Sequence, residues 1–345
     1  MNTKLHFPID APPAEGEAIE VAEGILWLRL PLPMALDHVN IYAIADGDGW
    51  CIIDTGYHSK RGIALWQHIL AGPLQGKPVT RALVTHHHPD HVGMAGWLQT
   101  HHGTELLSSR TAWIYARMLT LDVQKEFPPE TLKFFREAGM DGDILAKRLE
   151  AGPRNFADVV HDMPLGYRRL RHGDTIRIGH RTWDIRRGDG HAPEHLTLWS
   201  REDDIVISGD QVLPGISSNV GVYATEPEAD PMAEWLESCD ALMEHATDEQ
   251  LVLPGHKLPF HGLPTRLKQL ADNQRAGLDR LVEFLETPRT ANQCFPVLFK
   301  RKVGLAEHSL ALGEAVAHLN HLHFNDRIMR EKGPDGAFLW RKKHA

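Results

Sequence analysis

The sequence predicts a layered α/β fold, large enough for one large domain or two smaller ones. Strand-like and helix-like segments alternate along the chain, which favours sheets covered by helices. Hydrophobic residues make up 42% and charged residues 24% of the 345 positions, which are ordinary values for a globular protein. No run of about 18 apolar residues occurs, so the sequence predicts no membrane-spanning helix.

The first part of the predicted core begins after residue 20. Short apolar runs bounded by Pro, Gly or Asp predict strands over 25–30, 39–45, 50–54, 79–85 and 105–108. Helical patterns are expected over 91–101 and over 60–70, where the amphipathic stretch ends at Gly72-Pro73. Residues 1–20 are expected to be an N-terminal extension. They lack the basic end and apolar stretch of a secretion signal, so we do not expect export by that route.

The later part supplies the remaining strands and two long helices. A helical stretch with aromatic and Met residues, about 110–160, lies between two strands and suits an insertion over a site. Strands resume over 167–170, 175–178, 183–187, 196–200, 204–208 and 251–253, and helices are expected over 231–245 and 264–285. We therefore expect one main domain over 21–287.

Thr287-Pro288 marks the expected start of a small C-terminal domain, 288–345. Helices are predicted over 291–302 and 306–322, followed by a hairpin of 327–330 and 337–341. Two helices and a hairpin suggest a winged-helix-like domain. From Lys300 onward nine Lys and Arg stand against five Asp and Glu, so this end is mildly basic.

Charge and cysteine content restrict the partners and the compartment. The formal charge of −9 argues against general binding to DNA or RNA. Three widely separated cysteines without a CxxC pair are typical of reduced thiols, so we expect a cytoplasmic protein. The unusual feature is the number of histidines, 23, because histidine is the commonest metal-binding side chain.

A histidine-rich segment, His86-His87-His88-Pro89-Asp90-His91, follows a predicted strand. Residues two apart in an extended segment point the same way, so His86 and His88 can face one point. Pro89 permits a helix from the next residue onward, which turns Asp90 and His91 towards a second point nearby. One short stretch can thus offer three imidazoles and a carboxylate to two adjacent positions.

Three further candidates follow predicted strands in the same manner. Each comes directly after a glycine, where the backbone can turn sharply: His191, Asp210 and His256. Ligands on loops at one edge of a rigid sheet are typical of a catalytic metal site. Imidazole and carboxylate donors suit Zn²⁺, although Fe or Mn would accept the same donors.

Together these residues resemble the metallo-β-lactamase superfamily of hydrolases. The matching pieces occur in the family's order across most of 25–285: Asp54 in Ile53-Asp54-Thr55-Gly56, the HxHxDH segment, His191, Asp210 and His256. The resemblance implies a four-layer αββα sandwich with the site along one edge. It also implies two metal positions and one bridge: His86, His88 and His191 on the first metal, Asp90, His91 and His256 on the second, and Asp210 on both.

The implied chemistry is that of a binuclear zinc hydrolase. Two zinc ions about 3.5–4 Å apart can share a hydroxide, which would attack a carbonyl while Asp210 or water protonates the leaving group. Asp90 and Asp210 are the predicted catalytic carboxylates. We interpret Asp54 as an acceptor that orients a ligating imidazole, or else as a strand-end turn residue. His195 is either a partner of the ligands or a packed structural histidine.

Departures from the family pattern reduce the number of substrate classes that we expect. Asp210 stands where antibiotic-hydrolysing relatives carry Cys or Ser, and Leu213 stands where lactonases of the family carry Tyr. Lys257-Leu258 replaces the Glu-Tyr pair of glyoxalase II proteins. We therefore expect a thioester or ester hydrolase. The alternatives are a metal-dependent phosphodiesterase or endoribonuclease, a lactonase and, remotely, a non-catalytic nucleic-acid-binding protein.

The expected partner is a small molecule such as an acyl-CoA. The apolar insertion would hold its acyl group, and the basic tail would meet the phosphates of the carrier. Four residues are expected to line the pocket: His38, Ser217, Asn219 and Tyr223. We expect no nucleic-acid or membrane partner, and a homodimer stays open.

Overall fold

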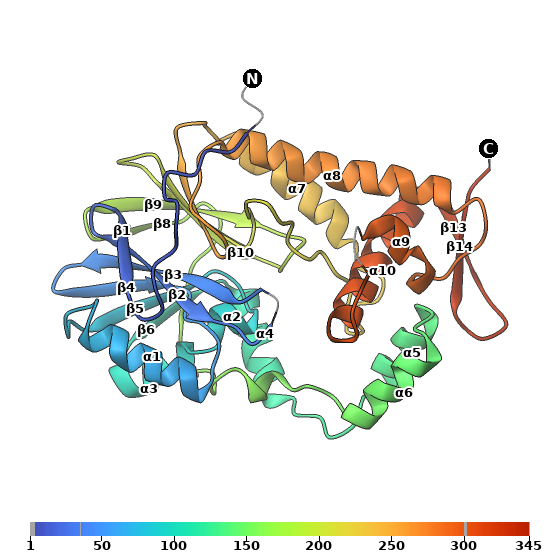
Figure 1. Ribbon diagram of the computed structural model, residues 1–345, viewed down its shortest axis with the longest axis horizontal. Coiled ribbons are helices and arrows are strands. Elements are labelled where there is room, and N and C mark those ends of the chain that lie inside the picture. The colour runs from blue at the N-terminus through green and yellow to red at the C-terminus, as the bar shows by residue number, and fades with distance from the viewer. Residues whose placement is uncertain (1–3, 35, 300–301, 345) are drawn as a thin grey trace. The chain divides into compact units, whose positions relative to one another are not determined.

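A computed structural model describes residues 4–34, 36–299 and 302–344 (Figure 1). The chain divides into two compact units, each taken by itself below. The first unit comprises Met1–Val123, Asn155–Ser218 and Leu242–Leu267, and the second comprises Gln124–Arg154, Asn219–Ala241 and Lys268–Ala345. None of the described helices is both long and apolar enough to cross a membrane.

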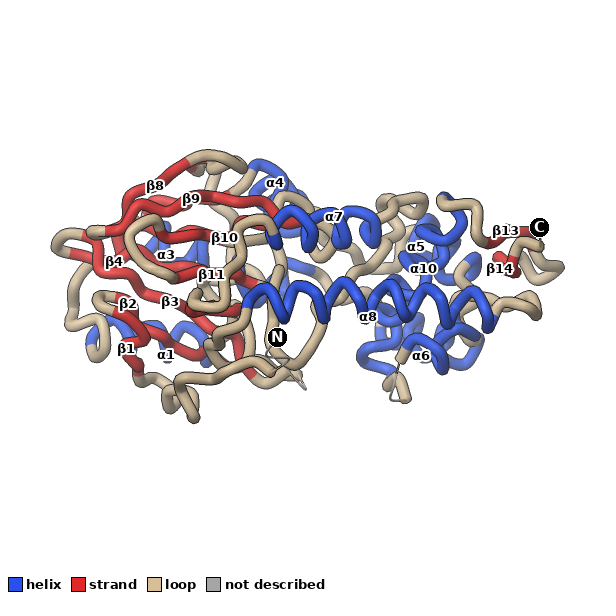
Figure 2. The backbone as a smooth tube through the Cα atoms, turned by 90° about the horizontal axis from the view of Figure 1, so that it is seen from above, coloured by secondary structure: helices blue, strands red, loops and turns tan. Residues whose placement is uncertain are grey.

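Two sheets form the core of the first unit, and their strands are seen in Figure 2. The larger sheet has seven strands in chain order: β1 (Ala18–Ala22), β2 (Ile25–Pro31), β3 (His38–Asp46), β4 (Gly49–Ile53), β5 (Val79–Val84), β6 (Glu105–Ser108) and β7 (Arg168–Arg169). The smaller sheet runs in the order β12 (Leu251–Pro254), β11 (Ile205–Gly209), β10 (His195–Ser200), β9 (Arg181–Gly188) and β8 (Thr175–Ile178). Strand β1 begins inside the predicted N-terminal extension, so the sheet starts earlier than expected.

The two sheets bury a shared apolar layer. Trp27 and Leu83 of the larger sheet belong to the same buried cluster as Trp183 and Leu198 of the smaller sheet. Removing such large apolar side chains from water is the main driving force that holds two sheets face to face. Cys51 lies in this layer, where burial raises the pKa of its thiol to about 12. The thiol therefore stays protonated and acts as an apolar packing group.

Helices cover the outer face of the larger sheet, where Figure 1 shows α1 (Lys60–Ala71) and α3 (Ala95–His102). Trp66 of α1 and Leu98 of α3 are fully buried there. The prediction of one continuous helix over 91–101 is wrong, because the segment forms two helices: a short α2 (Pro89–Val92) precedes α3. The chain turns at Gly93, where a Cβ would lie 2.4 Å from the Pro89 carbonyl oxygen, so only glycine fits.

One edge of the two sheets gathers several strand ends. Strands β11 and β12 are parallel neighbours, so Gly209 and Pro254 end side by side. The backbone N–H of Leu196, in β10, donates to the carbonyl of Thr85, just after β5, at 2.8 Å. The two sheets are therefore joined at the edge where the candidate ligands follow.

The second unit is mainly helical. It contains α5 (Pro129–Glu137), α6 (Gly142–Ala151), most of α7 (Pro231–Met243) and of α8 (Leu263–Phe284), α9 (Phe295–Leu298), α10 (His308–Phe324) and the hairpin β13 (Ile328–Lys332) and β14 (Phe338–Lys342). The segment predicted as a helical insertion contains three helices and is divided between the units, since α4 (Arg110–Leu121) belongs to the first unit and α5 and α6 to the second.

Within the second unit the insertion packs on the C-terminal segment. The N–H of Asn292 donates to the carbonyl of Ala138, and a Cβ on Gly139 would lie 2.4 Å from the Cβ of Thr290. The helix predicted over 291–302 is wrong in length: α9 ends before Phe299, whose backbone is extended. Positions 300 and 301 of that prediction lie outside the described residues. The hairpin is present, and the winged-helix description of this region stays a prediction.

Candidate metal centre

The candidate ligands follow the ends of four strands at the joined edge of the sheets, and two of them, Asp90 and His91, lie in α2. The histidine-rich segment follows β5, His191 lies between β9 and β10, Asp210 follows β11, and His256 follows β12. All belong to the first unit. Residues that are far apart in the sequence therefore meet because the strands before them end at the same edge.

Three imidazoles form the first group of donors. His86 Nε2 lies 3.0 Å from His88 Nδ1, which lies 3.1 Å from His191 Nε2, and His191 Nε2 lies 3.3 Å from His86 Nε2. Three ring nitrogens that converge in this way are the donors of a metal site with imidazole ligands.

A second group combines Asp90, His91 and His256. The Asp90 Oδ2 lies 3.3 Å from His256 Nε2 and 3.5 Å from His91 Nε2. Asp210 lies between the groups, because its Oδ2 is 3.2 Å from His256 Nε2, 3.4 Å from His91 Nε2 and 3.7 Å from His191 Nε2. The structure thus brings all seven predicted ligands together in two adjoining groups.

Unsatisfied atoms in this cluster test whether a cation fits. Among the described residues, the buried Nε2 of His91 and Oδ1 of Asp210 have no hydrogen-bond partner. Buried polar atoms are normally paired, so two orphaned atoms facing the same cluster favour an ion between them. Gly255 leaves the necessary room, since a Cβ there would lie 2.2 Å from Asp210 Oδ1. The donors present therefore suit the metal ions that the sequence implies.

Asp54 orients two of the imidazoles. His91 Nδ1 donates to its Oδ2 at 2.8 Å, which leaves the lone pair of Nε2 directed at the cluster. The hydroxyl of Thr85 donates to Asp54 at 2.9 Å and accepts from His86 Nδ1 at 3.0 Å. Thr85 has no predicted role, although it directly precedes His86 in the sequence and directly follows β5, the neighbour of β4, which ends just before Asp54.

His256 is oriented by the backbone. Its Nδ1 donates to the carbonyl of His38 at 2.7 Å, which leaves Nε2 for the cluster. The His38 ring is itself engaged, because Nδ1 donates to Asp37 at 2.5 Å and Nε2 accepts from the N–H of Lys257 at 2.9 Å. Burial lowers the pKa of His38 to about 4, consistent with this neutral form. The structure therefore gives His38 contacts with the ligand loop, and both ring nitrogens are occupied.

His195 supports Asp210 from its backbone side. Its Nε2 accepts from the N–H of Asp210 at 3.1 Å, and its ring stacks on His86 with centroids 4.7 Å apart. A Cβ on Gly209 would lie 2.7 Å from this ring. His195 is completely buried and contacts two ligand residues without belonging to either donor group.

The electrostatics of the cluster favour a cation. Burial lowers the pKa of His86 and of His88 well below the ordinary value, so both imidazoles are neutral donors. Burial also opposes protonation of His256, but Asp210 and Asp90 raise the pKa of His256 to about 9. Facing carboxylates raise the pKa of His91 in the same way, against the effect of burial. A metal ion would replace the protons that these carboxylates attract.

Of the other three predicted pocket residues, one is exposed in the first unit and two belong to the second unit. Ser217 is exposed and belongs to the first unit. Asn219 belongs to the second unit, where its amide donates to Glu314 at 2.7 Å. Tyr223 is 49% exposed in the same unit. The contacts of these three residues are thus outside the donor cluster, and their place in a substrate pocket stays a prediction.

Comparison with known proteins decides the family. The sequence pattern described as "Metallo-beta-lactamase superfamily" matches residues 34–282. This chain belongs to the metallo-beta-lactamase superfamily. A second pattern, described as "Metallo-beta-lactamase-like, C-terminal domain", matches residues 278–343.

Relatives of this superfamily member extend over nearly the whole chain. A beta-lactamase domain protein from Burkholderia ambifaria is 38% identical over 98% of both chains, with a TM-score of 0.91. The probable metallo-hydrolase YqjP of Bacillus subtilis is 25% identical over 89% of this chain and 94% of its own length. The predicted fold and the predicted hydrolase class are both confirmed.

A more distant relative carries a more specific name. The atrochrysone carboxyl ACP thioesterase of Aspergillus fumigatus is 22% identical over 87% of this chain, and the match covers 58% of that protein's length. A metallo-beta-lactamase family protein from Thermus thermophilus shares the fold, with 24% identity over 94% of this chain and a TM-score of 0.79.

Proposed function

We propose that this hydrolase is a dinuclear zinc enzyme that cleaves a thioester or ester, with an acyl-CoA-like substrate. The observation that carries the proposal is the position of Asp210 Oδ2, within 3.7 Å of His191 in one donor group and of His91 and His256 in the other. Two zinc ions bound there would lower the pKa of a water molecule towards about 7 and polarise a substrate carbonyl.

The side chains of the cluster supply positioning and proton transfer. Asp210 or a water molecule can carry the proton from the attacking water to the leaving thiol or alcohol. The acyl–sulfur or acyl–oxygen bond breaks as the water oxygen bonds to the acyl carbon. Asp54, Thr85 and the His38 carbonyl fix the ring orientations throughout.

Helix α4 supports an acyl substrate. Its buried face carries Ala112 and Ala116, whereas the opposite face exposes Ile114, Met118 and Leu121 at spacings of four and three residues. Tyr115 of this helix lies 5.1 Å, between ring centroids, from His87 in the ligand segment. An exposed apolar stripe beside a reactive centre suits an acyl chain. The relative named as an ACP thioesterase agrees with this class.

Metal removal and a substrate panel test the proposal together. We expect two zinc ions per chain by elemental analysis, and hydrolysis of acyl-CoA thioesters or of esters that stops on chelation and returns with zinc. The panel also contains lactones and phosphodiesters. Full turnover by metal-free protein would overturn the metal-dependent mechanism, and hydrolysis of phosphodiesters alone would overturn the substrate class.

The ion pairs of the basic tail weaken its expected role in binding phosphates, both those of RNA and those of a carrier such as CoA. Four of the five basic residues Arg327, Arg330, Arg341, Lys342 and Lys343 form ion pairs within the second unit: Arg327 with Asp279, Arg330 with Glu228, Lys342 with Glu283 and Glu286, and Lys343 with Asp326. Cations that are already paired attract phosphates weakly. An RNA-binding assay over a salt series would reveal phosphate contacts as a steep loss of affinity.

A further inference from the structure

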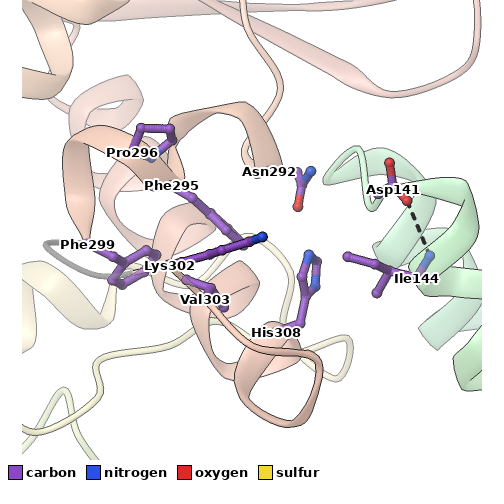
Figure 3. Close-up of a pocket in the computed structure, with 9 residues that line it drawn as sticks. All are labelled: Asp141, Ile144, Asn292, Phe295, Pro296, Phe299, Lys302, Val303 and His308. Carbon is purple, nitrogen blue, oxygen red and sulfur yellow. Dashed lines mark hydrogen bonds between the residues drawn. The ribbon is translucent and has the colours of Figure 1, made fainter.

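The second unit contains an aromatic hollow of about 540 Å³, with two phenylalanine rings on its walls (Figure 3). Lys302 and Asp141 also line it, so two opposite charges face the same space. The unpartnered Oδ1 of Asn292 and Nδ1 of His308 are buried and closed to solvent. Among the described residues, the hollow thus has no unbalanced charge and no accessible unpaired group that would select a ligand. The polar contacts that indicate a further role lie in the first unit.

Strand β3 begins with a row of buried polar side chains. His38, Asn40 and Tyr42 alternate along the strand, so they point to the same face of the sheet. Farther along, this face becomes apolar, since Ile44 lies with Tyr42 in the layer shared by the two sheets. Buried polar groups are normally hydrogen-bonded. All three side chains form their hydrogen bonds with the segment 254–257, which carries a candidate ligand.

Asn40 makes the central contacts of this row. Its Nδ2 donates to the carbonyl of Pro254 and to the carbonyl of Lys257, each at 2.8 Å. Both partners only accept, so the amide must present its NH₂ group to them. The backbone N–H of Asn40 donates to the carbonyl of Gly255 at 2.7 Å. One residue thus binds the backbone on both sides of His256.

Two further contacts fix the start of the same segment. The hydroxyl of Tyr42 donates to the carbonyl of Pro254 at 2.8 Å. The N–H of Gly255 donates to the carbonyl of Gly209, directly before Asp210, at 2.8 Å. The backbone that carries His256 is therefore tied to β3 and to the backbone that carries the bridging carboxylate.

The residue after His256 needs these contacts most. Lys257 adopts a φ of 72°, in the left-handed region that costs free energy for a residue with a side chain. Its N–H donates to His38 Nε2 at 2.9 Å, and its carbonyl accepts from Asn40. Without the Asn40 amide, Lys257 can relax towards an ordinary conformation and carry the His256 ring away from the donor cluster.

We propose that Asn40 is a positioning residue that holds His256 at the second metal position, an inference that rests on the proposed function because that function requires two metal ions. Asn40 belongs to neither donor group and acts only through the backbone of 254–257. Its loss should therefore weaken the ion of the second donor group and spare the ion of the first donor group.

Zinc affinities measured by competition with a chelator test the inference without any hydrolysis. Asn40→Leu keeps the branched shape of the side chain but removes both donors. We expect it to weaken one of the two bound ions about 10- to 100-fold and to leave the other unchanged. Asn40→Ser keeps one hydroxyl donor and should weaken the same ion less. If Asn40→Leu does not fold, Asn40→Ser must still show this selective loss.

Asn320→Leu is the matched control, in the second unit. Asn320 and Asn40 are each 1% exposed, and the Asn320 amide likewise donates to two carbonyls, those of Pro227 at 2.9 Å and Ala229 at 3.0 Å. Its replacement removes the same kind of contact at a distance in sequence from every ligand. We expect a lower Tm and an unchanged affinity for both ions.

Ligand variants identify which ion is weakened. In His88→Ala the ion that remains is held by the second donor group, and adding Asn40→Leu should weaken it about 10- to 100-fold. In His256→Ala the ion that remains is held by the first donor group, and adding Asn40→Leu should have no effect. This difference separates the positioning of His256 from general damage to the fold.

The outcomes distinguish the inference from the proposed function. Unchanged zinc affinity in both Asn40 variants, an equal loss in Asn320→Leu, or an equal loss in the His256→Ala background would overturn the role of Asn40 while leaving the dinuclear site intact. An unaltered protein that binds fewer than two zinc ions would instead refute the dinuclear site on which the inference rests.

Discussion

At the scale of single residues, Asp54 shows how one carboxylate can serve two ligands. It accepts from His91 directly and reaches His86 through the hydroxyl of Thr85. Asp54 adopts a positive φ of 61°, in the left-handed region that non-glycine residues rarely occupy. Local backbone strain of this kind persists where surrounding contacts hold it in place. The orientation of two donor imidazoles therefore depends on one residue with an unusual backbone conformation.

Thr85→Val tests the link to His86. Valine keeps the shape but removes the hydroxyl, so His86 loses an acceptor and Asp54 loses a donor. We expect metal affinity to fall about 10- to 100-fold while the fold is retained. A competition titration against a chelator measures this. Thr104→Val, which removes a buried hydroxyl bonded to the Val79 carbonyl, is the control, and equal affinity in the two variants would contradict the link.

Gly255→Ala tests the space reserved beside Asp210. The added Cβ would lie 2.2 Å from Asp210 Oδ1 and 2.9 Å from His91 Cε1, so the carboxylate must move away from the donor cluster. We expect the metal content to fall below two ions per chain, with loss of activity. Gly166→Ala, which meets only open space, should keep full content. Normal metal content in Gly255→Ala would show that Asp210 does not bridge the two groups.

At the scale of elements, strand ends position the polar donor residues, and one helix exposes a row of apolar side chains. Parallel pairing of β11 with β12 brings the loops of Asp210 and His256 together, and β5 adds the histidine-rich segment. Helix α4 packs on the core with its small residues and exposes its large apolar ones. Polar chemistry therefore comes from the sheet edge, and apolar contact from the neighbouring helix.

Replacement of both Ile114 and Met118 by Ser tests the apolar face of α4. These side chains are 45% and 43% exposed, so their loss should disturb the fold little. If they hold an acyl chain, kcat/KM for long-chain thioesters should fall about tenfold or more, because apolar contact is worth roughly 25 cal/mol per Å². An acetyl thioester should be unaffected. Leu165→Ser, at another exposed apolar side chain, is the control; a uniform loss over all chain lengths would contradict the assignment.

Helix α10 carries a partly buried carboxyl, Glu314, that makes the stability depend on pH. Burial raises the pKa of Glu314 to about 7, above its ordinary 4.5, although Asn219 donates to it. The resulting contribution to stability is complete below about pH 4.5 and is lost as the pH rises through about 7. The Tm of Glu314→Gln minus the Tm of the unaltered protein should therefore increase as the pH is raised from 5 to 8. Glu331→Gln, at an exposed position, should show no such trend, and parallel Tm curves would contradict the prediction.

At the scale of the whole molecule, the chain separates into a unit with the donor cluster and a unit with the aromatic hollow. The sequence predicted most strands and the ligand-bearing segments of the first unit, because these features leave local signals. Apolar runs located most strands, and the glycines before His191, Asp210 and His256 marked the turns that carry ligands. The family pattern over 34–282 agrees with that prediction.

Other features of the fold depend on contacts between segments that are distant in the sequence. Local sequence patterns do not indicate such contacts. The packing of Gly139 against Thr290 joins the insertion to the C-terminal region, and no periodicity indicates it. The binding of His38 to the Lys257 backbone spans 219 residues. The hollow combines an α6 residue, Ile144, with the side chains of Asn292 and His308, so it exists only in the folded chain.

The donor residues follow strands of two sheets, and they are synthesised at different times. The segment from His86 to His91 leaves the ribosome roughly a hundred residues before His191, and Asp210 and His256 come later still. A cation captured by the nascent chain would be held by an incomplete coordination sphere and could still exchange. All seven donors can therefore surround an ion only after the smaller sheet has docked on the larger one.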